Sequence, residues 1–386
     1  MTSTLFRNTI HNVPAAMLRR VFAIALLGFL VAAPARANED TIDPTRAVFV
    51  SLSDQPAVAV IDPDTDTLAG RIDIGLVPRQ IELASSIGKL LAIDGQSPRV
   101  NIVDLNLGTI RTVTLDLVAD RLTVTPDGLT AALADTGSGR VVLLDLLRRR
   151  ILGSVSDLPA LHDMVFSADS ASLYLAGDRQ GAIDVVSVAT GRLETAIATG
   201  LPHGSLALRR APNGRRLFAQ PDGGGGVGVL DPGRSGALDP IPAGPAPTVA
   251  FPSATGAYLL VADNRLGTLT IVHDGDVSNA AVLKASTGVD AIYSAWFDTL
   301  ALVPSAAAGA VLLYDLEMMR PAGSIALAAA AGRGAVTPDG QKLYLPLTDA
   351  GEVAVINARQ RRLTASIAVP GHPFSAVLAG SYGVCH

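Results

Sequence analysis

The chain has 386 residues, of which 49% are hydrophobic and 17% are charged, and its formal net charge is −5. This composition excludes an intrinsically disordered chain, because an apolar content this high can bury a large core. The acidic balance argues against nucleic acid or an anionic membrane surface as a partner.

The first 37 residues have the pattern of a secretory signal peptide. Arg7, Arg19 and Arg20 precede an apolar run at 21–33, and Ala35-Arg36-Ala37 offers a cleavage site between small residues. The run is too short to span a bilayer, which needs about 20 apolar residues. The adjacent arginines leave both general secretion (Sec) and twin-arginine (Tat) export open.

Cleavage after Ala37 leaves residues 38–386 as the mature domain. Its formal charge is −9, because the leader holds four arginines and no acidic residue. We expect a periplasmic or secreted protein with no membrane span after cleavage and no nucleic-acid partner. Cys385 is the single cysteine, so no internal disulfide can form.

A short cassette recurs through the mature domain: an apolar strand that ends in Asp, or in a substitute for it, at a turn. Successive cassettes lie 41 to 44 residues apart. A period this steady indicates one supersecondary unit copied eight times. The turn residues are Asp62, Asp104, Asp145, Ser187, Asp231, His273, Asp315 and Asn357.

Each unit contains four short runs with strand chemistry, separated by turns rich in Gly, Asp and Pro. In the third unit the expected strands are 121–125, 129–134, 141–144 and 151–155. Four such strands form one antiparallel sheet, and radial repetition of the sheet forms a β-propeller. The fold class is therefore all-β, with a single propeller domain whose repeats cover about 46–378.

The two ends of the repeat region are out of phase with the unit. The region begins with a second-type strand at 47–52 and ends with a first-type strand at 374–378. The C-terminal strand should therefore join the N-terminal blade and close the ring. This predicts eight complete blades of four antiparallel strands.

The turn after the first strand recurs as Thr125-Pro126-Asp127-Gly128, Ala211-Pro212-Asn213-Gly214 and Thr337-Pro338-Asp339-Gly340. At these residues the chain resembles the YVTN/YncE-like propeller family. That resemblance implies the fold and almost no chemistry, and it leaves seven blades as the alternative count. Eight blades also resemble the haem-binding propeller of cytochrome-type nitrite reductases and the related maturation protein NirF.

The loops that enter the innermost strands open at one mouth of the central channel of a propeller, so they supply the candidate ligand-binding residues. These are Arg79, Arg121, His162, Asp163, His203, Asp290, Arg333 and His372. In one interpretation the arginines hold an anion by paired hydrogen bonds, as on a haem-type tetrapyrrole. In another, His162, His203 and His372 bind a transition metal. In a third, polar residues simply fill a solvated mouth.

A second ring of acidic residues follows the second strands. It consists of Asp54, Asp94, Asp135, Asp178, Asp222, Asp263 and Asp349. Asp accepts backbone N–H groups in tight turns, so a structural role accounts for the ring, with an acidic collar as the alternative. Trp296, the single Trp, is predicted to pack within an innermost strand.

No catalytic motif stands out, and an enzyme is the less favoured interpretation. We expect an exported, non-catalytic scaffold that binds a small anionic ligand or a periplasmic protein partner at the channel mouth. One alternative is a NirF-like protein that binds or matures a tetrapyrrole. Another is an accessory subunit of a periplasmic quinoprotein or amine dehydrogenase system, which rests on fold analogy.

Overall fold

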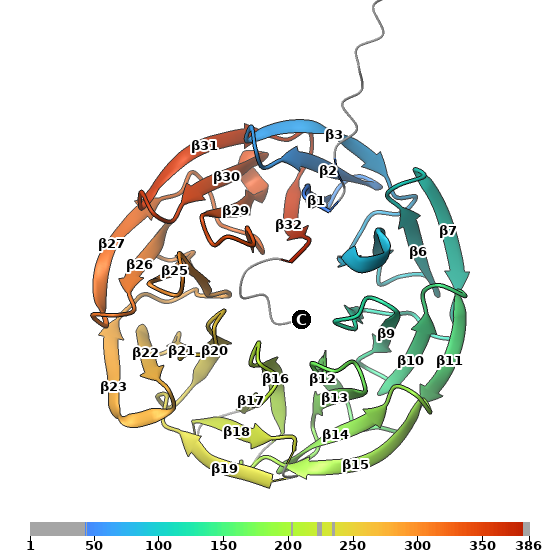
Figure 1. The fold of residues 1–386 in the computed structure, drawn as a ribbon, viewed down its shortest axis with the longest axis horizontal. Coiled ribbons are helices and arrows are strands. Elements are labelled where there is room, and N and C mark those ends of the chain that lie inside the picture. The colour runs from blue at the N-terminus through green and yellow to red at the C-terminus, as the bar shows by residue number, and fades with distance from the viewer. Residues whose placement is uncertain (1–42, 44, 202–203, 222–225, 234–235, 381–386) are drawn as a thin grey trace, which may run out of the picture. The chain divides into compact units, whose positions relative to one another are not determined.

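The computed structural model describes residues 43, 45–201, 204–221, 226–233 and 236–380. The predicted signal peptide lies outside the described residues. In the unit that begins at residue 42, eight four-stranded antiparallel sheets stand around one central axis as the blades of a propeller (Figure 1). The alternative of seven blades is therefore wrong.

The first four blades follow the chain from the N-terminal side. Blade 1 consists of β1 (Val48–Leu52), β2 (Ala57–Asp62), β3 (Thr67–Asp73) and β32 (Pro373–Leu378). Blade 2 consists of β4 (Gln80–Ala84), β5 (Lys89–Ile93), β6 (Arg99–Asp104) and β7 (Thr109–Thr114). Blade 3 consists of β8 (Arg121–Val124), β9 (Thr130–Asp135), β10 (Arg140–Asp145) and β11 (Arg150–Val155). Blade 4 consists of β12 (Leu161–Phe166), β13 (Ser172–Gly177), β14 (Ala182–Ser187) and β15 (Arg192–Ala198).

The remaining four blades complete the ring. Blade 5 consists of β16 (Ser205–Arg210), β17 (Leu217–Pro221), β18 (Val227–Asp231) and β19 (Gly236–Ile241). Blade 6 consists of β20 (Pro247–Pro252), β21 (Tyr258–Asp263), β22 (Thr268–His273) and β23 (Asp276–Lys284). Blade 7 consists of β24 (Tyr293–Ala295), β25 (Leu300–Ser305), β26 (Ala310–Asp315) and β27 (Arg320–Ala326). Blade 8 consists of β28 (Ala335–Val336), β29 (Lys342–Leu347), β30 (Glu352–Asn357) and β31 (Arg362–Ala368).

Two short 3-10 helices lie in connections between strands. Helix η1 (Ser85–Ile87) connects β4 to β5 in blade 2, and η2 (Thr348–Ala350) connects β29 to β30 in blade 8. Within the described ranges no helix is long and apolar enough to cross a membrane.

The C-terminal strand closes the ring as its phase predicted. β32 pairs antiparallel with β1, with Val48 opposite Leu378 and Ser51 opposite Ser375. Blade 1 thus joins residues more than 300 positions apart, which holds the two ends of the repeat region in one hydrogen-bonded sheet.

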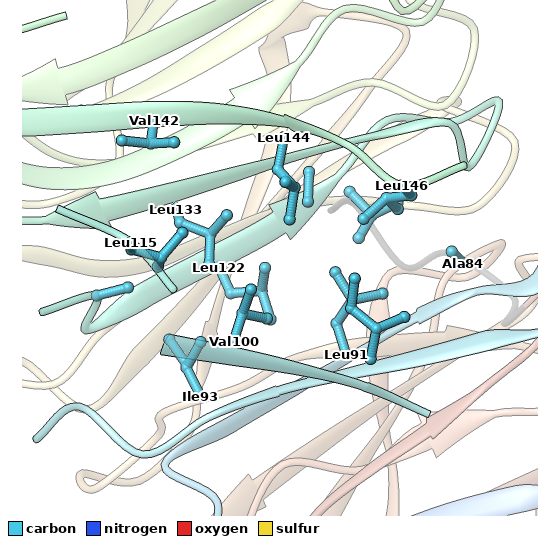
Figure 2. Close-up of a cluster of buried hydrophobic side chains, with 14 of the residues drawn as sticks. Ala84, Leu91, Ile93, Val100, Leu115, Leu122, Leu133, Val142, Leu144 and Leu146 are labelled. Carbon is cyan, nitrogen blue, oxygen red and sulfur yellow. The ribbon is translucent and has the colours of Figure 1, made fainter. Parts of the chain in front are cut away.

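The core lies between neighbouring blades. Buried side chains of blades 2 and 3 face one another in Figure 2, where Leu91 and Ile93 of β5 lie across from Leu122 and Leu133. The described residues form eight such clusters, one for each pair of adjacent blades. Middle strands are therefore buried on both faces and read as continuous apolar runs, whereas the outer strand β11 is mostly exposed.

The repeated turn residues have a local structural role. Asp127 accepts hydrogen bonds from the Thr125 hydroxyl (2.6 Å) and the Leu129 N–H (2.9 Å), while Gly128 adopts a left-handed conformation. The cassette Asp has the same role in the turn between the third and fourth strands of a blade. In blade 2, Asp104 accepts the N–H groups of Asn106 and Leu107 at 3.1 Å. The motif that predicts the fold is thus a set of turn-forming hydrogen bonds.

Trp296 departs from its predicted position. Strand β24 ends at Ala295, and Trp296 begins a turn in which three successive residues have positive φ angles of 49°, 57° and 57°. Its ring lies 5.4 Å below the guanidinium of Arg359 and contacts Phe297 edge to face. The third turn residue, Asp298, accepts the N–H groups of Ala254 and Thr255 of blade 6, which holds this strained turn in place.

Candidate functional site

The candidate site is a cavity of about 460 Å³ on the propeller axis. All eight blades contribute lining residues, either from the innermost strand or, as for Asp290 of blade 7, from the loop that enters it. Its volume falls within the range of roughly 300–1,000 Å³ that is usual for small-molecule sites.

The structure brings five of the eight predicted residues to this cavity: Arg121, His162, Asp163, Asp290 and Arg333. Arg79 is not among the lining residues, and its Nε donates to the carbonyl oxygen of Asp120 at 3.4 Å. His372 is also outside the lining, and its backbone N–H donates to Asp54 at 2.9 Å. His203 lies outside the described residues.

Asp163 joins two blades. One carboxylate oxygen accepts the N–H of Met164 at 3.0 Å. The other accepts the N–H of Leu208 at 3.1 Å and Nη1 of Arg209 at 2.7 Å, both on blade 5. These three hydrogen bonds engage both oxygens of Asp163 within the protein, so its carboxylate serves the contact between blades 4 and 5.

His162 is oriented by a member of the acidic ring. Its Nε2 lies 2.7 Å from Oδ1 of Asp178, and about a third of the imidazole is exposed. A carboxylate at one ring nitrogen sets the tautomer and leaves the other nitrogen for a ligand.

Three charged side chains at the cavity have no partner among the residues that the structure describes. Arg121, Arg333 and Asp290 line it, and among the described residues none of the three side chains makes a hydrogen bond or ion pair. Arg121 is half-buried, whereas Arg333 and Asp290 are exposed. Guanidinium groups carry a permanent positive charge and bind anions through paired hydrogen bonds, so Arg121 and Arg333 can each bind an anion.

The sequence reasoning missed several polar or charged residues of the cavity wall, among them Gln80, Glu82, Thr123 and Arg209. The Gln80 side chain bridges blades 2 and 3, because it donates to the carbonyl oxygen of Leu122 (2.6 Å) and accepts its N–H (3.0 Å). The hydroxyl of Thr123 is buried without a hydrogen-bond partner. These positions lie inside the strands, one or more residues beyond the entry loops where we sought the site.

The acidic ring has mainly the turn-forming role. Asp94 accepts the N–H groups of Gln96 and Ser97, and Asp263 accepts those of Arg265 and Leu266. The hydrogen bond from the backbone N–H of His372 lowers the pKa of Asp54 below its ordinary value. Asp222 lies outside the described residues. Two other members of the ring contact predicted site residues, because Asp178 binds the His162 imidazole and Asp54 accepts the backbone N–H of His372.

The described residues contain no group of three or more His, Cys, Asp or Glu side chains arranged to hold a metal ion. The two described histidines of the predicted three-His site are separated, since His162 lines the cavity and His372 does not.

Comparison with known proteins supports the fold. The structure of the dihydro-heme d1 dehydrogenase NirN in complex with DHE has a TM-score of 0.74 at 15% identity, covering 88% of this chain and 76% of that chain. Apo AztD from Citrobacter koseri has a TM-score of 0.63 at 14% identity over 86% and 96% of the two chains. Hydrazine synthase from Kuenenia stuttgartiensis has a TM-score of 0.53 at 16% identity over 73% and 95%.

The chain is an eight-bladed β-propeller. At identities of 16% or less, these likenesses show the shared fold alone. No protein-family model and no curated protein matches the sequence.

Proposed function

We propose that this protein is an exported, non-catalytic binding propeller whose axial cavity holds a small anionic ligand through Arg121 and Arg333. One observation carries the proposal: two guanidinium groups that have no hydrogen-bond or ion-pair partner among the described residues line the same cavity. Planar guanidinium groups bind carboxylates and phosphates through paired hydrogen bonds. Arginine serves in proteins as an electrostatic binding group and not as a proton donor or acceptor, which favours a binding role for this pair.

Two features of the sequence extend this proposal, and a protein partner is a further possibility that it includes. The leader at 1–37 supports export to the periplasm or the medium. The turns built like Thr125-Pro126-Asp127-Gly128 support a place among YVTN/YncE-like repeats. A periplasmic protein partner would meet the same cavity mouth through an acidic side chain or a C-terminal carboxylate.

Titration calorimetry of the purified mature domain tests the anion site, with glutarate, citrate and phosphate as probes. We expect at least one probe to bind, and we expect Arg121→Gln and Arg333→Gln each to weaken it at least tenfold. The matched control is Arg46→Gln, because the Arg46 side chain is mostly exposed, pairs with Asp64 and does not line the axial cavity. Absence of binding by these probes and by every amino acid anion tested below, or equal weakening by Arg46→Gln, would refute the proposal.

A haem-type tetrapyrrole is the second candidate ligand, and a specific contact favours it. His162 offers an imidazole that Asp178 already orients at 2.7 Å, an arrangement common for metal-bound histidines. Arg121 and Arg333 would meet the carboxylates of such a ring, and the bound iron would supply the redox chemistry. NirN, whose structure holds DHE, has the same fold.

Haemin titrated into the mature domain separates the two candidates. A shift of the absorption bands at micromolar haemin that disappears in His162→Ala supports the tetrapyrrole. An unchanged spectrum rules it out, while probe binding in the calorimeter remains the test of the anion site. A shift that survives simultaneous replacement of His162, His203 and His372 shows that none of them is a ligand.

A further inference from the structure

The charges at the cavity divide into an internally satisfied set and a free set. Asp163 and Arg209 pair with each other at 2.7 Å, and Glu82 accepts a hydrogen bond from the Gln80 amide at 3.0 Å. The free set, whose side chains have no hydrogen-bond or ion-pair partner in the described part of the chain, consists of two positive groups, Arg121 and Arg333, and one negative group, Asp290. A ligand complementary to this set carries two anionic groups and one cationic group.

The blade order places the free charges around the axis. Asp290 precedes β24 of blade 7 and Arg333 precedes β28 of blade 8, so these opposite charges lie on neighbouring blades. Arg121 begins β8 of blade 3, and blades 1 and 2 stand between it and blade 8 (Figure 1). One cationic and one anionic group of the ligand should therefore be adjacent, with the second anionic group farther away.

We propose that the ligand is an amino dicarboxylate, that is, a free α-amino acid with an acidic side chain. Its ammonium group pairs with Asp290, its α-carboxylate with Arg333 and its side-chain carboxylate with Arg121. This inference rests on the proposed anion site and names its substrate class.

Asp290 gives the site its selectivity. A dicarboxylate without an amine would place a carboxylate beside the unpaired Asp290 carboxylate, and like charges in one site lower affinity. An amino acid with a neutral side chain would leave the half-buried Arg121 without an anion. The pattern therefore predicts discrimination against both kinds of analogue.

The cavity wall beside Arg121 offers a second polar group to the side-chain carboxylate of the ligand. Thr123 lies two residues along β8 from Arg121, and its side chain is 4% exposed with a hydroxyl that has no partner. Buried hydroxyl groups in proteins nearly always have a partner, so rotation of this group toward a bound carboxylate would satisfy it.

Calorimetry with matched ligand pairs tests the inference on the mature domain. The pairs are aspartate with succinate, glutamate with glutarate and 2-aminoadipate with adipate, so that each pair differs by the ammonium group alone. Glutamine and asparagine test the second carboxylate. We expect the best amino dicarboxylate to bind at least tenfold more tightly than its dicarboxylate partner and at least tenfold more tightly than the amide.

Two variants test which residue causes each ligand preference. Asp290→Asn should abolish the preference for the ammonium group, and Arg121→Gln should abolish the preference for the acid over the amide. Asp290 is exposed and makes no described contact, so its variant should fold, which thermal unfolding checks. If the dicarboxylates bind as tightly as the amino acids, or if Asp290→Asn keeps the preference, the inference is wrong although the anion site stands. If no anion of either series binds, both proposals fail.

Discussion

Replacing Asp163 with Ala distinguishes a structural role from a ligand-binding role at the cavity. The sequence placed Asp163 among ligand-binding residues, whereas the structure engages its carboxylate with Met164, Leu208 and Arg209. Each hydrogen bond to a charged group contributes about 1.5–3 kcal/mol. The two bonds to blade 5 therefore sum to roughly 3–6 kcal/mol, and solvent screening of this side chain, which is 23% exposed, reduces the expected loss to about 2–4 kcal/mol.

The assay is the urea midpoint of the mature domain, read by circular dichroism beside a matched control. Asp64→Ala also removes a carboxylate from an Arg pair, but that pair is 64% exposed on both sides and should contribute less than about 1 kcal/mol. Asp163→Ala also frees Arg209 at the cavity, so probe anions should bind at least as tightly as before. A stability loss no larger than that of Asp64→Ala, combined with weaker anion binding, would show that Asp163 belongs to the ligand site.

Three further predictions concern stability. Thr123→Val removes a buried hydroxyl without a partner, so thermal unfolding should show equal stability or a gain of about 1 kcal/mol, and a clear loss would reveal a missed partner. Burial raises the pKa of Tyr293 to about 12, so the stability from its neutral phenol is present below pH 10 and is lost as the pH rises from 10 to 12. Tyr293→Phe should flatten that alkaline decline in urea titrations, and an unchanged decline would contradict the assignment. Deleting residues 373–386 removes β32 and leaves β1 without its ladder partner, so the melting temperature should fall and dye binding to exposed apolar surface should rise; an unchanged melting curve would show that the ring does not need this closure.

The fold was predictable from the sequence because its signals are local and repeated. A turn such as Thr125-Pro126-Asp127-Gly128 is encoded by residues that bond within five positions of one another. The phase of the strands at 47–52 and 374–378 then predicted the closure by β32, since an incomplete sheet at each end needs its missing strand. The position of Trp296 was wrong because a run of positive φ angles has no signal in hydrophobic patterning.

The candidate site was predictable only as a region. Knowledge of which loops enter the innermost strands placed Arg121, His162, Asp163, Asp290 and Arg333 at the cavity. The same rule included Arg79 and His372, whose entry loops keep them outside the lining. It missed Arg209 because this residue lies near the end of the strand β16, beyond the entry loop to which the rule applies.

By itself, the sequence determined the repeat and predicted eight blades with a closing strand, because these follow from short-range turn chemistry and from periodicity, and the structure then excluded the alternative of seven blades. Only the tertiary structure decided which charges at the cavity are already paired. Asp163 meets Arg209 and His162 meets Asp178 through contacts between or across strands, whereas Arg121, Arg333 and Asp290 have no charged partner within the described ranges. Pairing depends on distances of a few ångströms between side chains far apart in the sequence, and no linear pattern contains those distances.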